Sequence, residues 1–126
     1  MEKFLNISNH VLAEEQITDI KKRFKNIEIV ELPEELKKQW CSLNPKNYKY
    51  IVQDICEFME DENIYKAHLA GFMPAVAYML RINEMYIDEG EMEFYYSFSE
   101  RVSEEKEING EIIKTSVFKH RGWYEY

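Results

Sequence analysis

Three consecutive polar residues, Ser8, Asn9 and His10, follow a short apolar run that begins at Phe4. The run has the length and composition of a buried β-strand, and a helical pattern begins a few residues later. In an open α/β sheet the first strand lies near the middle, and ligands bind outside the carboxyl ends of the strands. We therefore expect these three side chains at the mouth of a ligand crevice.

A glycine ends the segment that we expect to lie beside this first strand. Residues 64–70 have strand character, Gly71 follows them, and a helical pattern begins at Phe72. Glycine lets a ligand approach the backbone closely. The start of a helix offers free N–H groups and a positive dipole end, which together favour an anion. Gly71 and Phe72 are therefore predicted ligand contacts.

A third polar group lies on the predicted fourth strand, where polar and aromatic residues alternate from Glu91 onward. Ser97, Ser99 and Arg101 share one face of a strand, because side chains alternate with a period of two. Hydroxyls together with one guanidinium suit a phosphodiester, since the guanidinium fork matches phosphate oxygens. We expect these residues at the end of that strand, closing the same site.

Each group also has a purely structural interpretation. Ser8 and Asn9 could start a turn and cap the first helix. Gly71 could serve the corner between strand and helix, and Arg101 could pair with a nearby glutamate on the surface. The aromatic residues of the fourth strand could all belong to the core.

The sequence predicts no metal site and no cofactor. Its three histidines, His10, His68 and His120, match no local zinc motif. Residues 60–63 lack the alternating acidic positions of a calcium loop. No phosphate-binding loop, dinucleotide-binding glycine motif or G-x-S-x-G element is present.

The elements that must position these residues alternate along the chain. We predict helices over 13–25, from Pro33 to before Asn44, over 46–60 and over 72–84. We predict strands over 4–10, 27–32, 64–70, from 91 onward, and over 111–119, with Asn109-Gly110 as a hairpin turn. This order indicates an α/β fold, namely a small Rossmann-like, mostly parallel sheet flanked by helices, with a C-terminal β-hairpin.

Length and charge narrow the function classes. The 126 residues predict one domain, 1–126, that can form a core without metal ions or disulfides. A net charge of −8 disfavours duplex nucleic acid as a partner, because such binding requires neutralised phosphates. No apolar run approaches the roughly 20 residues of a membrane span. Cys41 and Cys56 lack redox-motif spacing, so we expect a reduced, cytoplasmic protein.

Several segments together resemble a group of small accessory proteins of type III CRISPR systems. They are LNISNH with the following AEEQ, IVELPEELKKQW, and the last 30 residues, beginning SFSERVSEEKE. The polar end of that group's first strand falls on Ser8, Asn9 and His10, and its hydroxyl-rich segment before Glu-Arg falls on Ser97, Ser99, Glu100 and Arg101. The group's C-terminal aromatic and basic pattern is altered here in residues 118–126.

The resemblance implies a homodimer of CRISPR-associated Rossmann-fold type that binds cyclic oligoadenylate, typically cyclic tetra-adenylate. Several members are ring nucleases that linearise the ring without metal and so switch off antiviral signalling. A ribose 2′-hydroxyl then attacks the adjacent phosphate to give a 2′,3′-cyclic phosphate. His10 is the implied acid or base, and Ser8, Asn9, Ser99 and Arg101 are implied to orient phosphates.

Two alternatives remain open at the level of the sequence. The chain could sequester the cyclic nucleotide without cutting it. It could also be a protein-interaction module whose acidic helices dock a partner and whose crevice holds no ligand.

Overall fold

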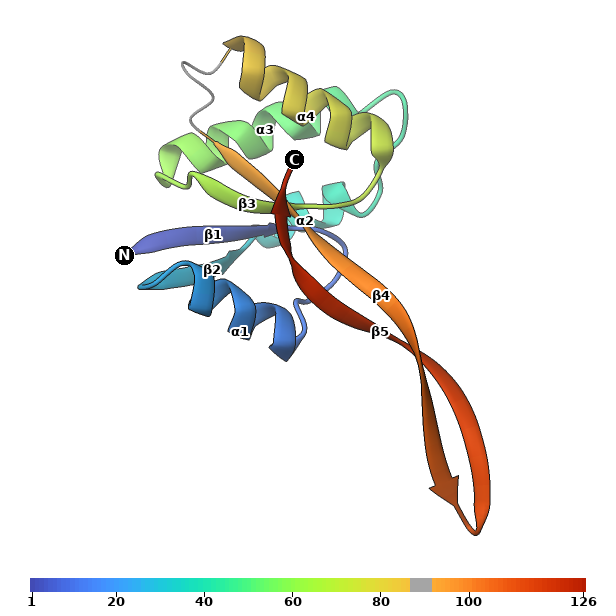
Figure 1. Ribbon diagram of the computed structural model, residues 1–126. Helices are drawn as coiled ribbons and strands as arrows, with labels where there is room; N and C mark the ends of the chain where they lie inside the picture. The colour runs from blue at the N-terminus through green and yellow to red at the C-terminus, as the bar shows by residue number, and fades with distance from the viewer. Residues whose placement is uncertain (87–91) are drawn as a thin grey trace.

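A five-stranded mixed sheet forms the centre of the molecule in the computed structural model, which describes residues 1–86 and 92–126 (Figure 1). The strands are β1 (Glu2–Ile7), β2 (Ile27–Glu31), β3 (Lys66–Leu69), β4 (Glu93–Ile108) and β5 (Glu111–Glu125). They lie in the order β2-β1-β3-β4-β5. The first four strands of this order are parallel, and β5 is antiparallel to β4. The predicted α/β class, mostly parallel sheet and C-terminal hairpin are therefore confirmed.

Helices cover both faces of the sheet (Figure 1). The described helices are α1 (Glu14–Arg23), α2 (Glu34–Trp40), α3 (Tyr48–Asp61) and α4 (Met73–Tyr86). Helix α1 packs on one face, and α2, α3 and α4 pack on the other. No helix in the described part of the chain is long and apolar enough to cross a membrane.

The two faces of the sheet have separate cores, and side chains of β1 alternate between them. Leu5 and Ile7 pack with α2, α3 and α4, whereas Phe4 packs with α1. The large face is lined by the apolar stripe of α3, namely Ile51, Val52, Ile55, Cys56 and Met59. The α1 face is smaller and more aromatic, because Phe4, Tyr95 and Trp123 meet there. Asn6 shares the α1 face with Phe4, since strand side chains repeat every second residue.

Strands β4 and β5 continue well beyond the rest of the sheet as a two-stranded arm (Figure 1). Only Glu93, Phe94 and Tyr95 of β4 pair with β3, although β4 extends to Ile108. The arm ends in the predicted turn, where Asn109 and Gly110 both have positive φ, 54° and 80°. Positive φ at both central residues is the requirement of a type I′ hairpin turn.

Two expectations about this hairpin were wrong. Strand β5 does not end near Lys119 but continues to Glu125, because the C-terminal residues pair with β4 and bury Trp123 against α1. Ser97, Ser99 and Arg101 lie within β4 and not at its end, because β4 continues to Ile108. The predicted start of this strand, Glu91, falls outside the described residues.

We predict that Gly71→Ala destabilises the protein more than Gly110→Ala does. Both glycines have positive φ, which costs an alanine roughly 1–2 kcal/mol. At Gly71 the added Cβ would also lie 3.0 Å from Trp40 Nε1, whereas nothing lies within 4 Å at Gly110. Urea unfolding should show an additional loss of about 1–3 kcal/mol for the first variant. Equal losses for both variants would contradict the proposed contact with Trp40.

Candidate functional site

The polar tip of β1 is held by its own buried side chains. Ser8 is only 3% exposed, and its hydroxyl lies 2.7 Å from Asn6 Oδ1 and 2.9 Å from the carbonyl oxygen of His10. Asn6 Nδ2 donates to the same carbonyl at 2.8 Å. The turn at Asn9 and His10 is thereby fixed while both of these residues remain exposed. Ser8 starts a turn, as its structural interpretation predicted, but the cap of α1 is Ala13.

Asn6 also determines which nitrogen of His68 carries the proton. Asn6 Nδ2 lies 3.1 Å from the carboxylate of Glu31 as well as near the His10 carbonyl, and both groups only accept hydrogen bonds. Asn6 Oδ1 therefore faces His68 Nδ1, at 3.1 Å, so Nδ1 must donate. The Nε2 atom of a neutral His68 then keeps its lone pair.

His68 is neutral at physiological pH. Its side chain lies on β3 beside Asn6, and the residue is 7% exposed. Burial, and after it the charges of His10 and His120, lower its pKa from 6.5 to about 4. A buried neutral imidazole with one anchored nitrogen is a fixed hydrogen-bond acceptor.

Asn6, Ser8 and His68 form what we call the Asn6–His68 group, and Trp123 connects it to a second polar group. Its ring lies edge-on to His68, with centroids 4.9 Å apart, and 5.3 Å from the ring of His120. Trp123 Nε1 donates to the backbone carbonyl of Gln16 on α1 at 3.1 Å, and Arg23 donates to the carbonyl of Trp123. The indole thus fixes β5 on α1 between two histidines.

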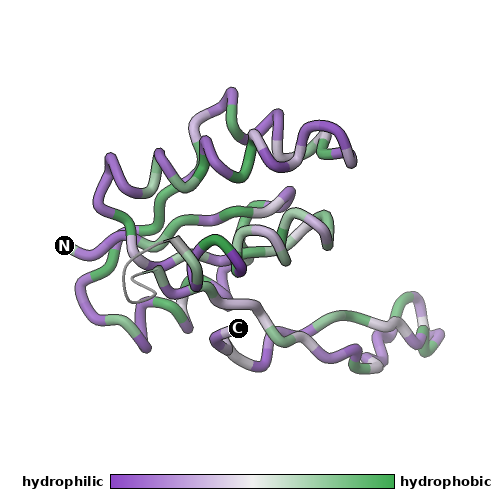
Figure 2. Tube along the Cα trace, turned by 90° about the horizontal axis from the view of Figure 1, so that it is seen from above, coloured by the Kyte–Doolittle hydropathy of each residue, from purple (hydrophilic) through white to green (hydrophobic). Residues whose placement is uncertain are grey.

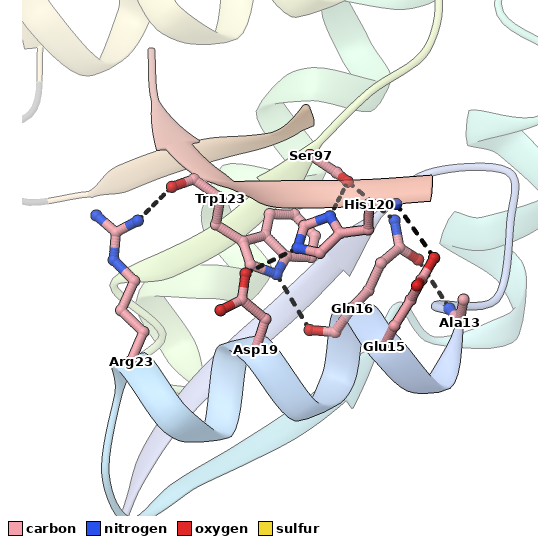
Figure 3. A network of polar contacts seen from close by, with 8 residues as sticks. All are labelled: Ala13, Glu15, Gln16, Asp19, Arg23, Ser97, His120 and Trp123. Carbon is pink, nitrogen blue, oxygen red and sulfur yellow. Dashed lines mark hydrogen bonds and ion pairs between the residues drawn. The ribbon is translucent and has the colours of Figure 1, made fainter. Parts of the chain in front are cut away.

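The second group joins α1, β4 and β5 through side chains that are far apart in the sequence (Figure 3). His120 Nδ1 lies 2.6 Å from Ser97 Oγ, and His120 Nε2 lies 2.8 Å from Asp19 Oδ2. The imidazole is nearly buried, with 5% of its side chain exposed. The backbone N–H of His120 also donates to Glu15 at 3.1 Å.

Gln16 completes this group from α1. Its Nε2 donates to Ser97 Oγ at 3.1 Å, while its Oε1 accepts from the backbone N–H of Ala13 at 2.7 Å (Figure 3). Ser97 is therefore held from two sides, by α1 and by His120. Because Ser97 pairs with Trp123 across β4 and β5, the whole group lies on the α1 face at one end of the sheet.

The predicted contacts at the β3 corner lie on the opposite face of the sheet. Gly71 approaches the indole of Trp40, which donates to the carbonyl of Ala70 at 3.1 Å. Phe72 is half-buried in the core of the large face and meets Tyr48 edge-on, with centroids 6.1 Å apart. Gly71 and Phe72 therefore pack toward the large face, although the corner adjoins the end of β1, where the Ala70 N–H donates to the carbonyl of Ile7 at 3.0 Å. Their ligand role stays a prediction.

Ser99 and Arg101 lie further along the arm. The register of β4 and β5 shifts by one residue between Phe98 and Ser99. Arg101 is exposed and places its guanidinium 5.1 Å from the centre of the Phe118 ring, a cation–π contact. Ser97 thus lies within the polar group at the α1 face, whereas Ser99 and Arg101 extend beyond it.

Sequence reasoning missed four members of the two polar groups, namely Asn6, Asp19, His68 and His120. Asn6 and His68 interrupt apolar strand runs, and a polar residue at a core position was the available signal. Asp19 and His120 carried no such signal, because they are 101 residues apart and meet only through the return of β5 to α1. His68 and His120 both contact Trp123, and His10 is near enough to His68 to lower its pKa, but no group of described residues has the arrangement of a metal site.

We predict that the buried His68 makes stability depend on pH. Its folded-state pKa of about 4 lies below the usual 6.5, so as pH falls the unfolded chain takes up the proton first. The free energy of unfolding should therefore decrease between about pH 6.5 and pH 4, by up to about 3 kcal/mol. In urea unfolding, His68→Gln should lose this part of the pH dependence. The exposed-site control His10→Gln should keep most of it, because burial is the larger cause of the lowered pKa. An unchanged pH dependence in His68→Gln would contradict the assignment.

Comparisons with known proteins agree on one family. A family described as "Uncharacterized protein MJ1673 family" matches residues 2–124. The protein MJ1673 of Methanocaldococcus jannaschii is 28% identical over 131 residues, which cover 100% of this chain and 98% of that relative. No solved structure matches the chain. The chain therefore belongs to the MJ1673 family.

Proposed function

We propose that this protein binds cyclic oligoadenylate, in particular cyclic tetra-adenylate, and linearises it without a metal ion. In this proposal it is a cytoplasmic homodimer of Rossmann-like fold that switches off type III CRISPR signalling. The proposal rests on the resemblance of the β1 tip and the C-terminal segment to type III accessory proteins, and on the placement of the polar residues in the fold.

The observation that carries the proposal is the position of the Asn6–His68 group at the point where the sheet reverses its order. From β1 the chain first adds β2 on one side and then β3 on the other. In open α/β sheets the carboxyl ends of the strands at such a point are the usual ligand site. Ser8, Asn9 and His10 follow β1 at this edge, and His68 lies in the neighbouring strand.

The contacts of the β1 tip suggest a division of roles. The hydroxyl of Ser8 is committed to Asn6 and to the backbone of His10, so Ser8 acts by positioning the turn. Asn9 and His10 are exposed and can contact the ligand. His10 is the acid or base of the reaction, and Asn9 contacts phosphate. Holding a 2′-hydroxyl in line with its phosphate and donating protons to developing charge supply the remaining catalysis.

The arm supports a dimer as the working form. A lone two-stranded hairpin is marginally stable in water. The arm projects from the rest of the molecule and includes hydrophobic stretches (Figure 2), and several of its apolar side chains are exposed. These are Phe98, Ile108, Ile112, Ile113 and Phe118. Residues 100–119 contain five acidic and four basic side chains, so two arms can approach with little repulsion, although the whole chain carries −8. Two copies would surround one symmetric ring.

We predict that the purified protein opens cyclic tetra-adenylate in the presence of EDTA and leaves products with 2′,3′-cyclic phosphate ends. His10→Ala should cut at least about 100-fold more slowly, the usual contribution of a general acid or base. Liquid chromatography with mass spectrometry measures both. Tight binding of an intact ring would instead identify a sequestering protein, and no binding would favour the interaction module. A His10→Ala variant that cuts at the wild-type rate would remove His10 from the mechanism.

We also predict that removing the arm yields a folded monomer. Replacing residues 103–116 by Asn-Gly joins Val102 to Val117, which pair across the arm as Ile108 and Glu111 do around the native turn. Val102 lies an even number of positions before Ile108, so the new turn keeps the hydrogen-bonding phase of the ladder. Light scattering should give twice 15.3 kDa for the native protein and the mass of one shortened chain for the variant. A native protein at the single-chain mass would contradict the dimer.

A further inference from the structure

We propose that Asp19, His120 and Ser97 form a proton relay that accepts the proton of the attacking ribose hydroxyl. This inference rests on the proposed function and assigns the general base of that reaction to Ser97, with His120 and Asp19 acting behind it. None of the three is part of the β1 tip, where sequence reasoning placed the acid or base.

The hydrogen-bond inventory of Ser97 supports this assignment. A serine hydroxyl has one proton to donate and two lone pairs that accept. His120 Nδ1, at 2.6 Å, takes the proton if His120 Nε2 carries its own proton toward Asp19, at 2.8 Å. Gln16 Nε2 donates to one lone pair of Ser97 at 3.1 Å. One lone pair of Ser97 therefore remains available for an incoming hydroxyl.

Burial determines which atom of the relay can reach a substrate. The His120 side chain is 5% exposed and both of its nitrogens are occupied, so the imidazole itself cannot contact a ribose. Ser97 is only partly buried and forms the accessible end of the relay. Asp19 is partly exposed on α1 and keeps the proton on the far nitrogen of His120, as a carboxylate does for a catalytic histidine elsewhere.

The proton transfers balance over one ring opening. The 2′-hydroxyl gives its proton to Ser97 Oγ, Ser97 gives its own proton to His120 Nδ1, and the resulting imidazolium is stabilised by Asp19. The 2′-oxygen forms a bond to phosphorus, and the bond from phosphorus to the 5′-oxygen breaks. His10 then acts as the acid that gives a proton to the leaving 5′-oxygen. His120 then releases its extra proton to water through Ser97, and His10 takes a proton from water.

The first test compares binding with cleavage in variants of the full chain. Ser97→Ala and Asp19→Asn should each lower kcat for cyclic tetra-adenylate by about 100-fold while the dissociation constant changes less than about threefold. Ser97→Thr should restore most of the rate, because it keeps the hydroxyl. The matched controls are Ser42→Ala on the far side of the sheet and Asp54→Asn on the outer face of α3, which should cut as the native protein does.

The outcomes separate the relay from the proposed function. If the native protein opens the ring and Ser97→Ala opens it equally fast, the relay is overturned and the function stands. If Ser97→Ala and Ser97→Thr lose binding and thermal stability together, the contacts are structural and the relay is overturned. A native protein that never opens the ring overturns the proposed function and, with it, the catalytic use of the relay.

A second measurement tests the relay without any nucleotide. Nitrogen-15 NMR of histidine-labelled protein reports which ring nitrogen carries the proton. We expect neutral His120 to carry its proton on Nε2, toward Asp19, and the opposite arrangement in His68, which donates from Nδ1. A His120 protonated on Nδ1 would overturn the relay even if the ring is opened, because Ser97 could not then pass its proton on.

Discussion

The return of β5 onto α1 through Trp123 is the interaction on which the rest of the structure depends. The indole is 2% exposed, it donates to the carbonyl of Gln16, and its ring meets Phe4, His68 and His120. Without this contact the final strand would have no core to join, and His120 would lie far from Asp19. One buried aromatic residue near the end of the chain thus closes the small core and brings the two polar groups next to each other.

The surroundings of the three histidines show how position sets chemistry for one residue type. His10 is exposed at the end of a turn that Asn6 and Ser8 hold in place. His68 is buried, has a lowered pKa and offers no charge near neutral pH. His120 is buried between a hydroxyl and a carboxylate, an arrangement suited to passing a proton. These environments differ because His10 lies in the turn after β1, whereas His68 and His120 lie within β3 and β5.

Local patterns were sufficient to predict most of the fold. The spacing of Ile51, Val52 and Ile55 indicated α3, and Asn109-Gly110 indicated the hairpin, because both signals arise within a few residues. The length of β5 could not be predicted in this way. Residues beyond Lys119 are polar and aromatic, and they form a strand because Trp123 finds a core that other segments build. Tertiary burial overrode a weak local preference.

The candidate site was predictable only in part for the same reason. Ser8 and His10 could be placed because they follow β1 directly. Ser97 could be assigned to β4 but not to its position within the strand, because β4 continues to Ile108. Gly71 was expected across the crevice from the β1 tip, and it packs against Trp40, whose indole donates to the carbonyl of Ala70. Face assignment at a corner depends on the packing of the following helix, which the strand pattern does not determine. Pairs such as Asp19 and His120 depend on the whole topology.

In the proposed function, cyclic oligoadenylate binds to the α1 face near Trp123, which is bordered by His10 and Ser97. The most direct measurement is a backbone and indole chemical-shift map of the protein during titration with cyclic tetra-adenylate. If the nucleotide binds there, the largest shifts fall on His10, Ser97 and the Trp123 indole. Shifts confined to Tyr48, Gly71 and Phe72 on the opposite face, or an unchanged spectrum at saturating nucleotide, would contradict it.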